Sequence, residues 1–175
     1  VFSDNERSYI LHRDGRERVE IRDNFAKSPN NRFYLEQSNG QESARLVTTD
    51  TDGQVRKIAF ANGETSKIKF GEYSDEHYFK YEDMDGKGGK EYIFADNKTL
   101  EVFSNPDSLR FNKTMNHEIL LKPIVYEFSE NNKKLGIVNQ NNNTLLLFNG
   151  KSGEMHSKFP LKGSYLFTVG FLGKE

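Results

Sequence analysis

Tight hairpins recur along this chain at a nearly constant spacing, and that recurrence restricts the fold more than any other feature. Each hairpin places turn-forming Asp, Asn or Gly between two strand-like runs, and the three clearest cover residues 46–60, 92–103 and 135–148. Their turn centres, Asp52, Asn97 and Asn142, are each 45 residues apart. Their second strands end in Phe60, Phe103 and Phe148, which we expect at equivalent places in successive units. The chain therefore contains an internal repeat.

Alternating large apolar side chains predict one further strand on each side of these hairpins. The strands before the hairpins carry Phe33 and Leu35, then Phe79 and Tyr81, then Val125, Tyr126 and Phe128. The strands after them carry Ile68 and Phe70, then Leu109 and Phe111, then Phe159 and Leu161. Four short antiparallel strands per unit are typical of β-propeller blades. We therefore predict an all-β fold of propeller blades, with units at approximately 32–71, 78–115 and 119–161.

The two ends of the chain carry incomplete units. An N-terminal hairpin from Tyr9 to Ile21 lacks an innermost strand, whereas the end of the chain alternates Tyr165, Phe167, Val169 and Phe171. Segments 1–24 and 163–175 can therefore combine into one composite blade, which would close a four-bladed ring. An open arc of a larger ring is the alternative, and the sequence leaves both open. In either case we interpret residues 1–175 as a single domain.

Helix signals are weak, because the candidate segments 23–27 and 105–108 are too short for three turns and lie beside Pro29 and Pro106. We expect little or no helix. The sequence starts at Val1, with strand-like residues almost at once, so we expect a processed chain or a piece of a larger protein.

Charge and composition restrict the partners. The net charge is −1 with Lys and Arg dispersed along the chain, which argues against nucleic acid. No apolar run reaches the length of a membrane helix, so we expect no transmembrane segment. There is no Cys, which excludes disulfides and thiolate metal sites but leaves the compartment open. Protein and carbohydrate remain as partner classes, and the oligomeric state is open.

One loop, residues 83–91, has a recognisable chemical pattern. It places the carboxylates of Asp83, Asp85 and Glu91 at positions one, three and nine of a glycine-rich segment, which is how oxygen ligands converge on a hard cation such as Ca²⁺. It is not an EF-hand, because position twelve is Phe94 instead of a bidentate Glu.

The segment 83–103 resembles the FG-GAP or VCBS type of propeller repeat, in which an Asp-x-Asp-Gly-x-Gly-x-x-Asp/Glu loop precedes a strand and then a Leu-x-Val-Phe strand. The resemblance implies side-chain ligands at positions one, three, five and nine, which are Asp83, Asp85, Lys87 and Glu91. Lys87 departs from the pattern, because an ammonium cannot ligate a cation. The other two units lack the acidic loop, with Gln37–Gly40 and Ser129–Asn132 in its place.

Two states of this loop stay open. In one, Asp83, Asp85 and Glu91 hold Ca²⁺; in the other, no cofactor is bound and a Lys ammonium or backbone amides face the carboxylates. We predict the second, with Lys87 or Lys90 as the source of positive charge.

Catalytic motifs are lacking in the sequence. The four histidines, His12, His77, His117 and His156, have no metal-ligand spacing, and we interpret each as a surface or strand residue. A carboxylate pair for glycoside hydrolysis would come from different blades and has no local pattern. The leading hypothesis is a non-catalytic binding or scaffold module, and the alternative is a glycan-acting propeller hydrolase. The resemblance implies a section of a larger exported protein in the periplasm, at the cell surface or outside the cell.

Overall fold

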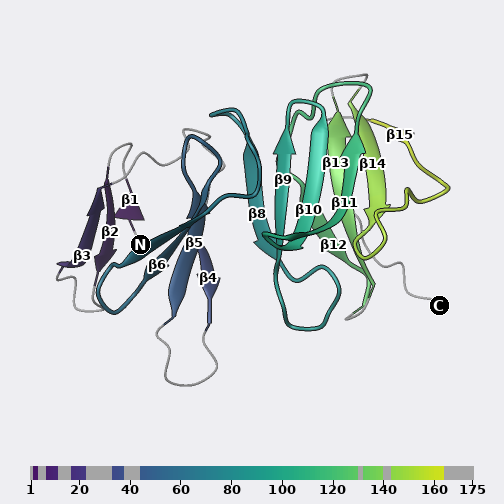
Figure 1. Ribbon diagram of the computed structural model, residues 1–175. Helices are drawn as coiled ribbons and strands as arrows, with labels where there is room; N and C mark the ends of the chain where they lie inside the picture. The colour runs from purple at the N-terminus through teal and green to yellow at the C-terminus, as the bar shows by residue number, and fades with distance from the viewer. Residues whose placement is uncertain are drawn as a thin grey trace. The chain divides into compact units, whose positions relative to one another are not determined.

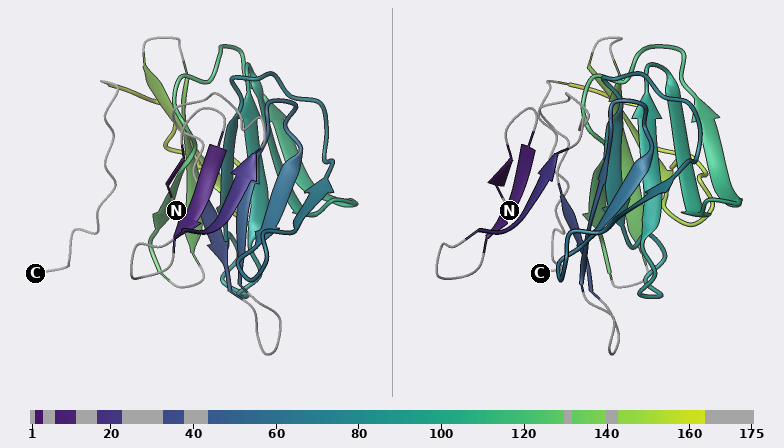
Figure 2. Two further views of the ribbon diagram at one scale, coloured as in Figure 1. Left: turned by 90° about the vertical axis from the view of Figure 1, so that its left-hand side faces the viewer. Right: turned by 60° about the vertical axis from the view of Figure 1, so that its left-hand side comes forward.

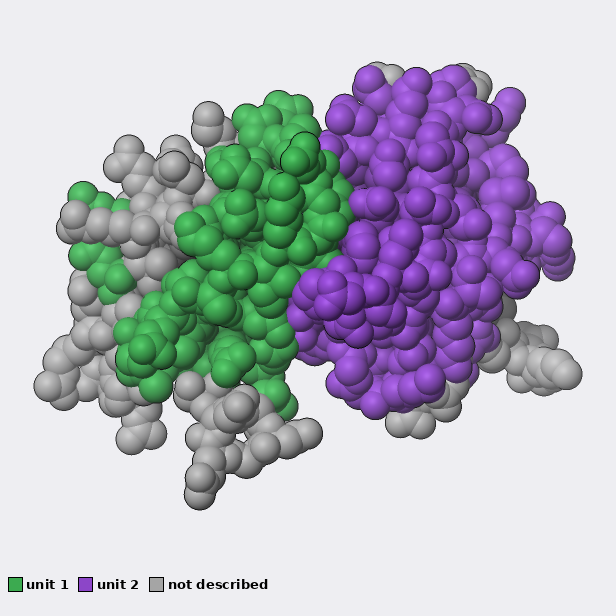
Figure 3. Space-filling model, viewed as in Figure 1, with its two compact units in different colours: residues 1–79 green, residues 80–175 purple. Residues whose placement is uncertain are grey.

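The computed structural model describes residues 2–3, 7–11, 17–22, 33–37, 44–129, 132–139 and 143–163. The chain divides into two compact units, residues 1–79 and 80–175 (Figure 3). None of the described residues is helical, so the expectation of an all-β fold is confirmed. Segment 23–27 lies outside the described residues, and 105–108 spans the turn between two strands. Within this part of the chain there is no helix with the length and apolarity that a bilayer crossing requires.

The first unit holds a three-stranded and a four-stranded antiparallel sheet (Figure 1). The smaller sheet has the order β1-β2-β3, and its strands are β1 (Phe2–Ser3), β2 (Arg7–Leu11) and β3 (Glu17–Arg22). The larger has the order β4-β5-β6-β7, and its strands are β4 (Tyr34–Glu36), β5 (Arg45–Thr49), β6 (Val55–Ala59) and β7 (Thr65–Ile68).

The second unit holds two four-stranded antiparallel sheets. The first has the order β11-β10-β9-β8, and its strands are β8 (Tyr78–Glu82), β9 (Glu91–Asp96), β10 (Thr99–Asn105) and β11 (Ser108–Thr114). The first two residues of β8 belong to the first unit. The second has the order β12-β13-β14-β15, and its strands are β12 (Ile124–Glu127), β13 (Lys133–Asn139), β14 (Thr144–Asn149) and β15 (Leu161–Lys162). In every four-stranded sheet, sequential strands are also neighbours. Figure 2 shows the strands in two further views.

The central hairpin of each four-stranded sheet lies where the repeat predicts it. The hairpins close at the pairs Thr49↔Val55, Asp96↔Thr99 and Asn139↔Thr144. Each turn contains a residue with positive φ: Gly53 at 73°, Asn97 at 49° and Asn143 at 49°. Gly and Asn adopt this left-handed conformation at the lowest steric cost, which explains why one of them recurs in each turn, at intervals of 44 and 46 residues.

The three repeated phenylalanines occupy related but unequal places. Phe103 lies on β10 and Phe148 on β14, the third strands of their sheets, and both are buried. Phe60 lies one residue beyond β6 and is half-buried against Leu46 and Ile58, and its N–H still donates to the Ala44 carbonyl at 3.0 Å. The backbone pairing of the repeat is therefore regular, whereas the burial of the repeated phenylalanine differs between units.

The second strands of both sheets in the second unit are buried on both faces. Consecutive side chains of a strand point to opposite faces, yet all of 92–95 on β9 and 135–138 on β13 are buried. The two sheets also pack against each other: a Cβ added at Gly153, after β14, would lie 2.5 Å from the Phe111 ring of β11. Only a glycine permits this approach.

Connectors between sheets cross the tips of the central hairpins. In the second unit, the Ile119 N–H donates to the Asn97 carbonyl at 2.7 Å, and the Leu120 N–H donates to the Val138 carbonyl at 2.9 Å. In the first unit, His77 lies in the connector and its Nε2 is 2.9 Å from the Thr49 hydroxyl. His77 is fully buried, so the expectation of a surface or strand residue is wrong at this position.

The N-terminal sheet confirms the predicted hairpin as β2 and β3, but its edge differs from the prediction. The short strand β1 pairs with β2 through Phe2↔Tyr9 and Ser3↔Ser8, where the sequence predicted no inner strand. Residues 163–175 were predicted to join this sheet, and all of them from 164 onward lie outside the described residues.

Candidate functional site

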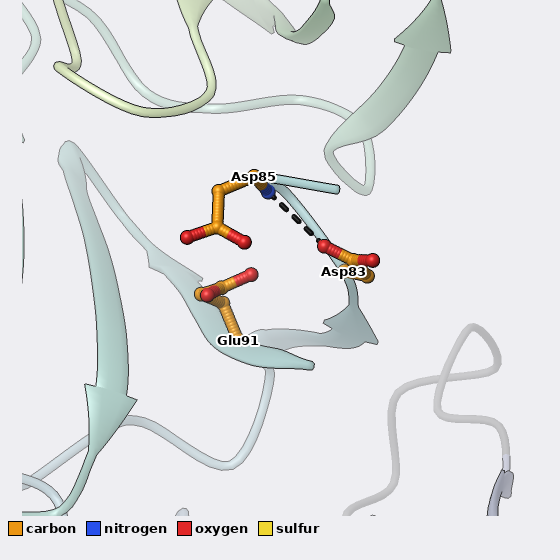
Figure 4. Close-up of side chains that lie close together, drawn as sticks. All are labelled: Asp83, Asp85 and Glu91. Carbon is orange, nitrogen blue, oxygen red and sulfur yellow. Dashed lines mark hydrogen bonds between the residues drawn. The ribbon is translucent and has the colours of Figure 1, made fainter. Parts of the chain in front are cut away.

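The acidic loop connects β8 to β9 in the second unit, where the sequence analysis placed it. Asp83 follows the end of β8, and Glu91 is the first residue of β9. The side chains of Asp83, Asp85 and Glu91 converge (Figure 4). One carboxylate oxygen from each lies within 4.8 Å of the others, and this is the one such acidic cluster among the described residues.

The Asp83 carboxylate organises the loop by accepting backbone hydrogen bonds. Its Oδ1 accepts the N–H groups of Asp85 at 3.1 Å and Gly86 at 2.7 Å, and its Oδ2 accepts the N–H of Gly88 at 3.0 Å. Gly86 and Gly88 have φ values of 74° and 84°, which turn the chain around the carboxylate. The spacing of acid and glycine residues thus produces the local fold directly.

An arginine that the sequence analysis did not consider neutralises the other two acids. Arg110 Nη2 lies 3.0 Å from Asp85 Oδ2 and 2.8 Å from Glu91 Oε1. The Arg110 side chain is 18% exposed, while those of Asp85 and Glu91 are 8% and 5% exposed. A guanidinium between two buried carboxylates is a charge-assisted arrangement in a largely dry environment.

A β-bulge delivers Arg110 to this position. In the β10–β11 ladder Val102 pairs with Phe111 and Phe103 with Leu109, so Arg110 is the extra residue on the outer strand. Bulges redirect the side chain of the inserted residue. Arg110 Nε then donates to the Ser104 hydroxyl at 3.2 Å, which helps to fix the guanidinium plane.

Every carboxylate oxygen of the cluster accepts a hydrogen bond or an ion pair. Besides the contacts above, Asp85 Oδ1 accepts the Lys87 N–H at 3.1 Å and Glu91 Oε2 accepts the Met84 N–H at 2.7 Å. The Lys87 ammonium is 80% exposed and lies 3.6 Å from Asp85 Oδ2, so its contribution is a weak surface one. The predicted role of backbone amides is found in the structure, whereas the main counter-charge comes from Arg110.

The surroundings move the two buried pKa values in opposite directions. Burial raises the pKa of Asp85, but hydrogen bonds from Arg110 and the Lys87 amide, together with both positive charges, outweigh it and lower that pKa below its ordinary value. For Glu91, burial dominates and raises the pKa. The Met84 amide and Arg110 oppose this increase, and the negative charges of Asp85 and Asp83 reinforce it.

The cluster has calcium-type ligands but does not fit Ca²⁺ as arranged. Ca²⁺ takes six to eight oxygen ligands at about 2.3–2.6 Å. Arg110 Nη2 already lies at hydrogen-bonding distance from both Asp85 and Glu91, so a cation bound to those oxygens would require Arg110 to move away. Calcium binding by Asp83, Asp85 and Glu91 therefore stays a prediction, and such binding would require the displacement of Arg110.

The other residues that the sequence singled out are Lys90 and the histidines. Lys90 Nζ lies 5.5 Å from the centroid of the Tyr81 ring, a distance at which cation–π attraction operates. His117 and His156 are exposed, and His12 lies outside the described residues. The sequence matches no protein-family model, and no curated protein is significantly similar to it.

Proposed function

We propose that this chain is a non-catalytic binding or scaffold module, built from propeller-type blades and belonging to a larger exported or surface protein. The FG-GAP or VCBS resemblance of segment 83–103 motivates the family and the location. Three four-stranded antiparallel sheets with sequential strand order support the blade interpretation.

The non-catalytic assignment rests mainly on how the acidic cluster is enclosed. Asp85 and Glu91 have shifted pKa values and lie as close together as the carboxylates of retaining glycosidases, which are about 5–5.5 Å apart. Their side chains are nevertheless only 8% and 5% exposed, and Arg110 bridges them. A glycan cannot reach buried, ion-paired acids, so the cluster acts in holding the loop to β9 and β11.

A paired screen tests this proposal. The protein is incubated with a panel of polysaccharides, and released reducing ends are measured beside binding to the same immobilised glycans. We expect no turnover. Hydrolysis that Glu91→Gln abolishes would show that the buried acids are catalytic and would refute the proposal. Hydrolysis that survives Glu91→Gln would refute it as well, by locating a catalytic site elsewhere in the chain.

A further inference from the structure

The second unit contains a groove of about 540 Å³ that the acidic cluster does not reach. Its lining residues come from the end of β11 and the connector that follows it, from strands β13 and β14, and from β15 and the segment that leads into it. Its volume is within the range of about 300–1,000 Å³ that is usual for sites binding small ligands.

The groove has an apolar surface. Leu146 and Phe148 of β14 contribute to it, together with Met115, Met155 and Pro160 from the connecting segments. Met155 is 50% exposed and forms part of this surface. Flexible methionines suit a surface that adapts to an apolar side chain of a ligand.

The charged residues of the groove are all basic. Lys113 from β11 and Lys162 from β15 line it with His117, and none of the lining residues, all in the described part of the chain, is acidic. Neither lysine forms an ion pair with a described residue. Two ammonium groups beside an apolar surface favour a ligand that carries a negative charge next to an apolar group.

Asn139 supplies an unsatisfied acceptor. This residue of β13 lines the groove, is 6% exposed, and its Oδ1 accepts no hydrogen bond from the described structure. A buried acceptor without a donor costs roughly 1–3 kcal/mol. Because this oxygen has almost no accessible surface, a donor in the groove reaches it only when the side chain rotates, which the soft terminal torsion of Asn allows.

We propose that this groove binds the C-terminal end of a peptide or protein whose last side chain is apolar. The terminal carboxylate meets Lys113 and Lys162, the last side chain packs on Phe148 and Met155, and a peptide N–H donates to Asn139. A peptide terminus carries the three groups that complement the groove: an anion, an apolar group and an N–H donor. This inference rests on the proposed binding function and names its ligand class.

The test is a titration of the ¹⁵N-labelled protein with N-acetylated Leu-Ala-Leu, followed by NMR. We expect saturable shifts of amides in segments 113–117, 144–148 and 155–162. The same tripeptide with a C-terminal amide is expected to bind about tenfold more weakly, because it lacks the charge. Octanoate, which has the charge and the chain but no N–H, is the third probe.

Charge reversals locate the site without disturbing the core. Lys113→Glu and Lys162→Glu are each expected to weaken the free-acid tripeptide about threefold or more, and Lys151→Glu, an exposed residue outside the groove, is expected to leave it unchanged. Equal binding of acid and amide, equal binding of octanoate, or insensitivity to both groove lysines would overturn the proposal. So would absence of binding, including the case in which another part of the chain covers the groove. Glycan turnover would refute the non-catalytic function separately, whatever the titration shows.

Discussion

Replacing Arg110 with Ala perturbs the acidic cluster at its centre. The change removes the guanidinium that lies 3.0 Å from Asp85 and 2.8 Å from Glu91, and it leaves two nearly buried carboxylates with backbone amides alone. Loss of one partner of a buried ion pair costs roughly 3–5 kcal/mol. Because the Arg110 side chain is 18% exposed, water reaches part of the site, and we take about 3 kcal/mol as the expected loss.

Urea unfolding followed by circular dichroism and tyrosine fluorescence measures this loss, since the chain has 8 Tyr and no Trp. A loss of about 3 kcal/mol corresponds to a fall in Tm of roughly 6–12 °C for a protein of this size. Ser104→Ala, which removes only the hydrogen bond to Arg110 Nε, is expected to cost about 1 kcal/mol.

Arg7→Ala is the matched control. Arg7 also pairs with a glutamate, Glu20, but at 3.6 Å and with 44% of its side chain exposed, so we expect a loss below about 1 kcal/mol. If Arg110→Ala were no more destabilising than Arg7→Ala, the conclusion that Arg110 neutralises the cluster would be wrong.

Calcium supplies a second readout of the same variant. Removal of Arg110 leaves three converging carboxylates without their cation, so we expect Arg110→Ala, unlike the wild type, to gain stability with added Ca²⁺. Saturation at one hundred times the dissociation constant would restore about 2.7 kcal/mol. A wild-type protein that is strongly stabilised by micromolar Ca²⁺ would instead show that the loop is a working metal site and that Arg110 yields to the ion.

Five further substitutions, grouped into three tests, probe the loop and the core. Lys87→Asp supplies the ligand missing from the family pattern and should create a calcium-dependent rise in Tm; an unchanged Tm would show that the loop lacks that geometry. Glu91→Gln and Asp85→Asn test two pKa shifts of opposite sign. The raised pKa of Glu91 stabilises the wild type below about pH 4.5, and this stabilisation is lost as the pH rises through the pKa that Glu91 has in the folded state. The lowered pKa of Asp85 stabilises the wild type above about pH 3.8, and this stabilisation is lost as the pH falls through the pKa that Asp85 has in the folded state. Unfolding free energies between pH 3 and 7 that show the same trend for both variants would contradict this assignment. Phe103→Ala should cost about 3–5 kcal/mol by urea unfolding, and Phe60→Ala clearly less because Phe60 is only half-buried; equal losses would show that the unequal packing of the repeat is wrong.

Local patterns in the sequence were sufficient to predict every described strand except β1. Period-two alternation of apolar residues and Asn or Gly at turns are both local, and each predicted flanking strand corresponds to an observed one among β4, β7, β8, β11, β12 and β15. Long-range features were missed for the same reason. Buried His77 places its Nε2 against the Thr49 hydroxyl, 28 residues away in sequence, and a local pattern does not predict such a contact.

The first unit offers a parallel case of a hidden ion pair. Arg56 Nη2 lies 2.6 Å from Asp50 Oδ2, with side-chain exposures of 5% and 2%, across the β5–β6 hairpin. Asp50 Oδ1 also accepts the N–H groups of Asp52 and Gln54, at 3.0 and 2.8 Å. An Asp in a turn is expected to accept hydrogen bonds from local amides. Its ion pair with a buried Arg cannot be predicted locally, because the burial of both side chains depends on the whole sheet.

The acidic loop illustrates how far sequence reasoning can reach in a metal-type motif. Asp83, Asp85, Glu91 and the glycines are close in sequence, so their convergence was predictable, and so was the need for a compensating positive charge. Lys87 was the nearest candidate in sequence, yet it is the one left largely in water. The charge comes from 25 residues beyond Asp85, on an outer strand where an arginine is ordinarily solvated, through a bulge that alternation patterns do not reveal. Because Arg110 lies at this bulge of β11 and pairs with Glu91 at the start of β9, a side-chain cation of the chain itself links the two strands.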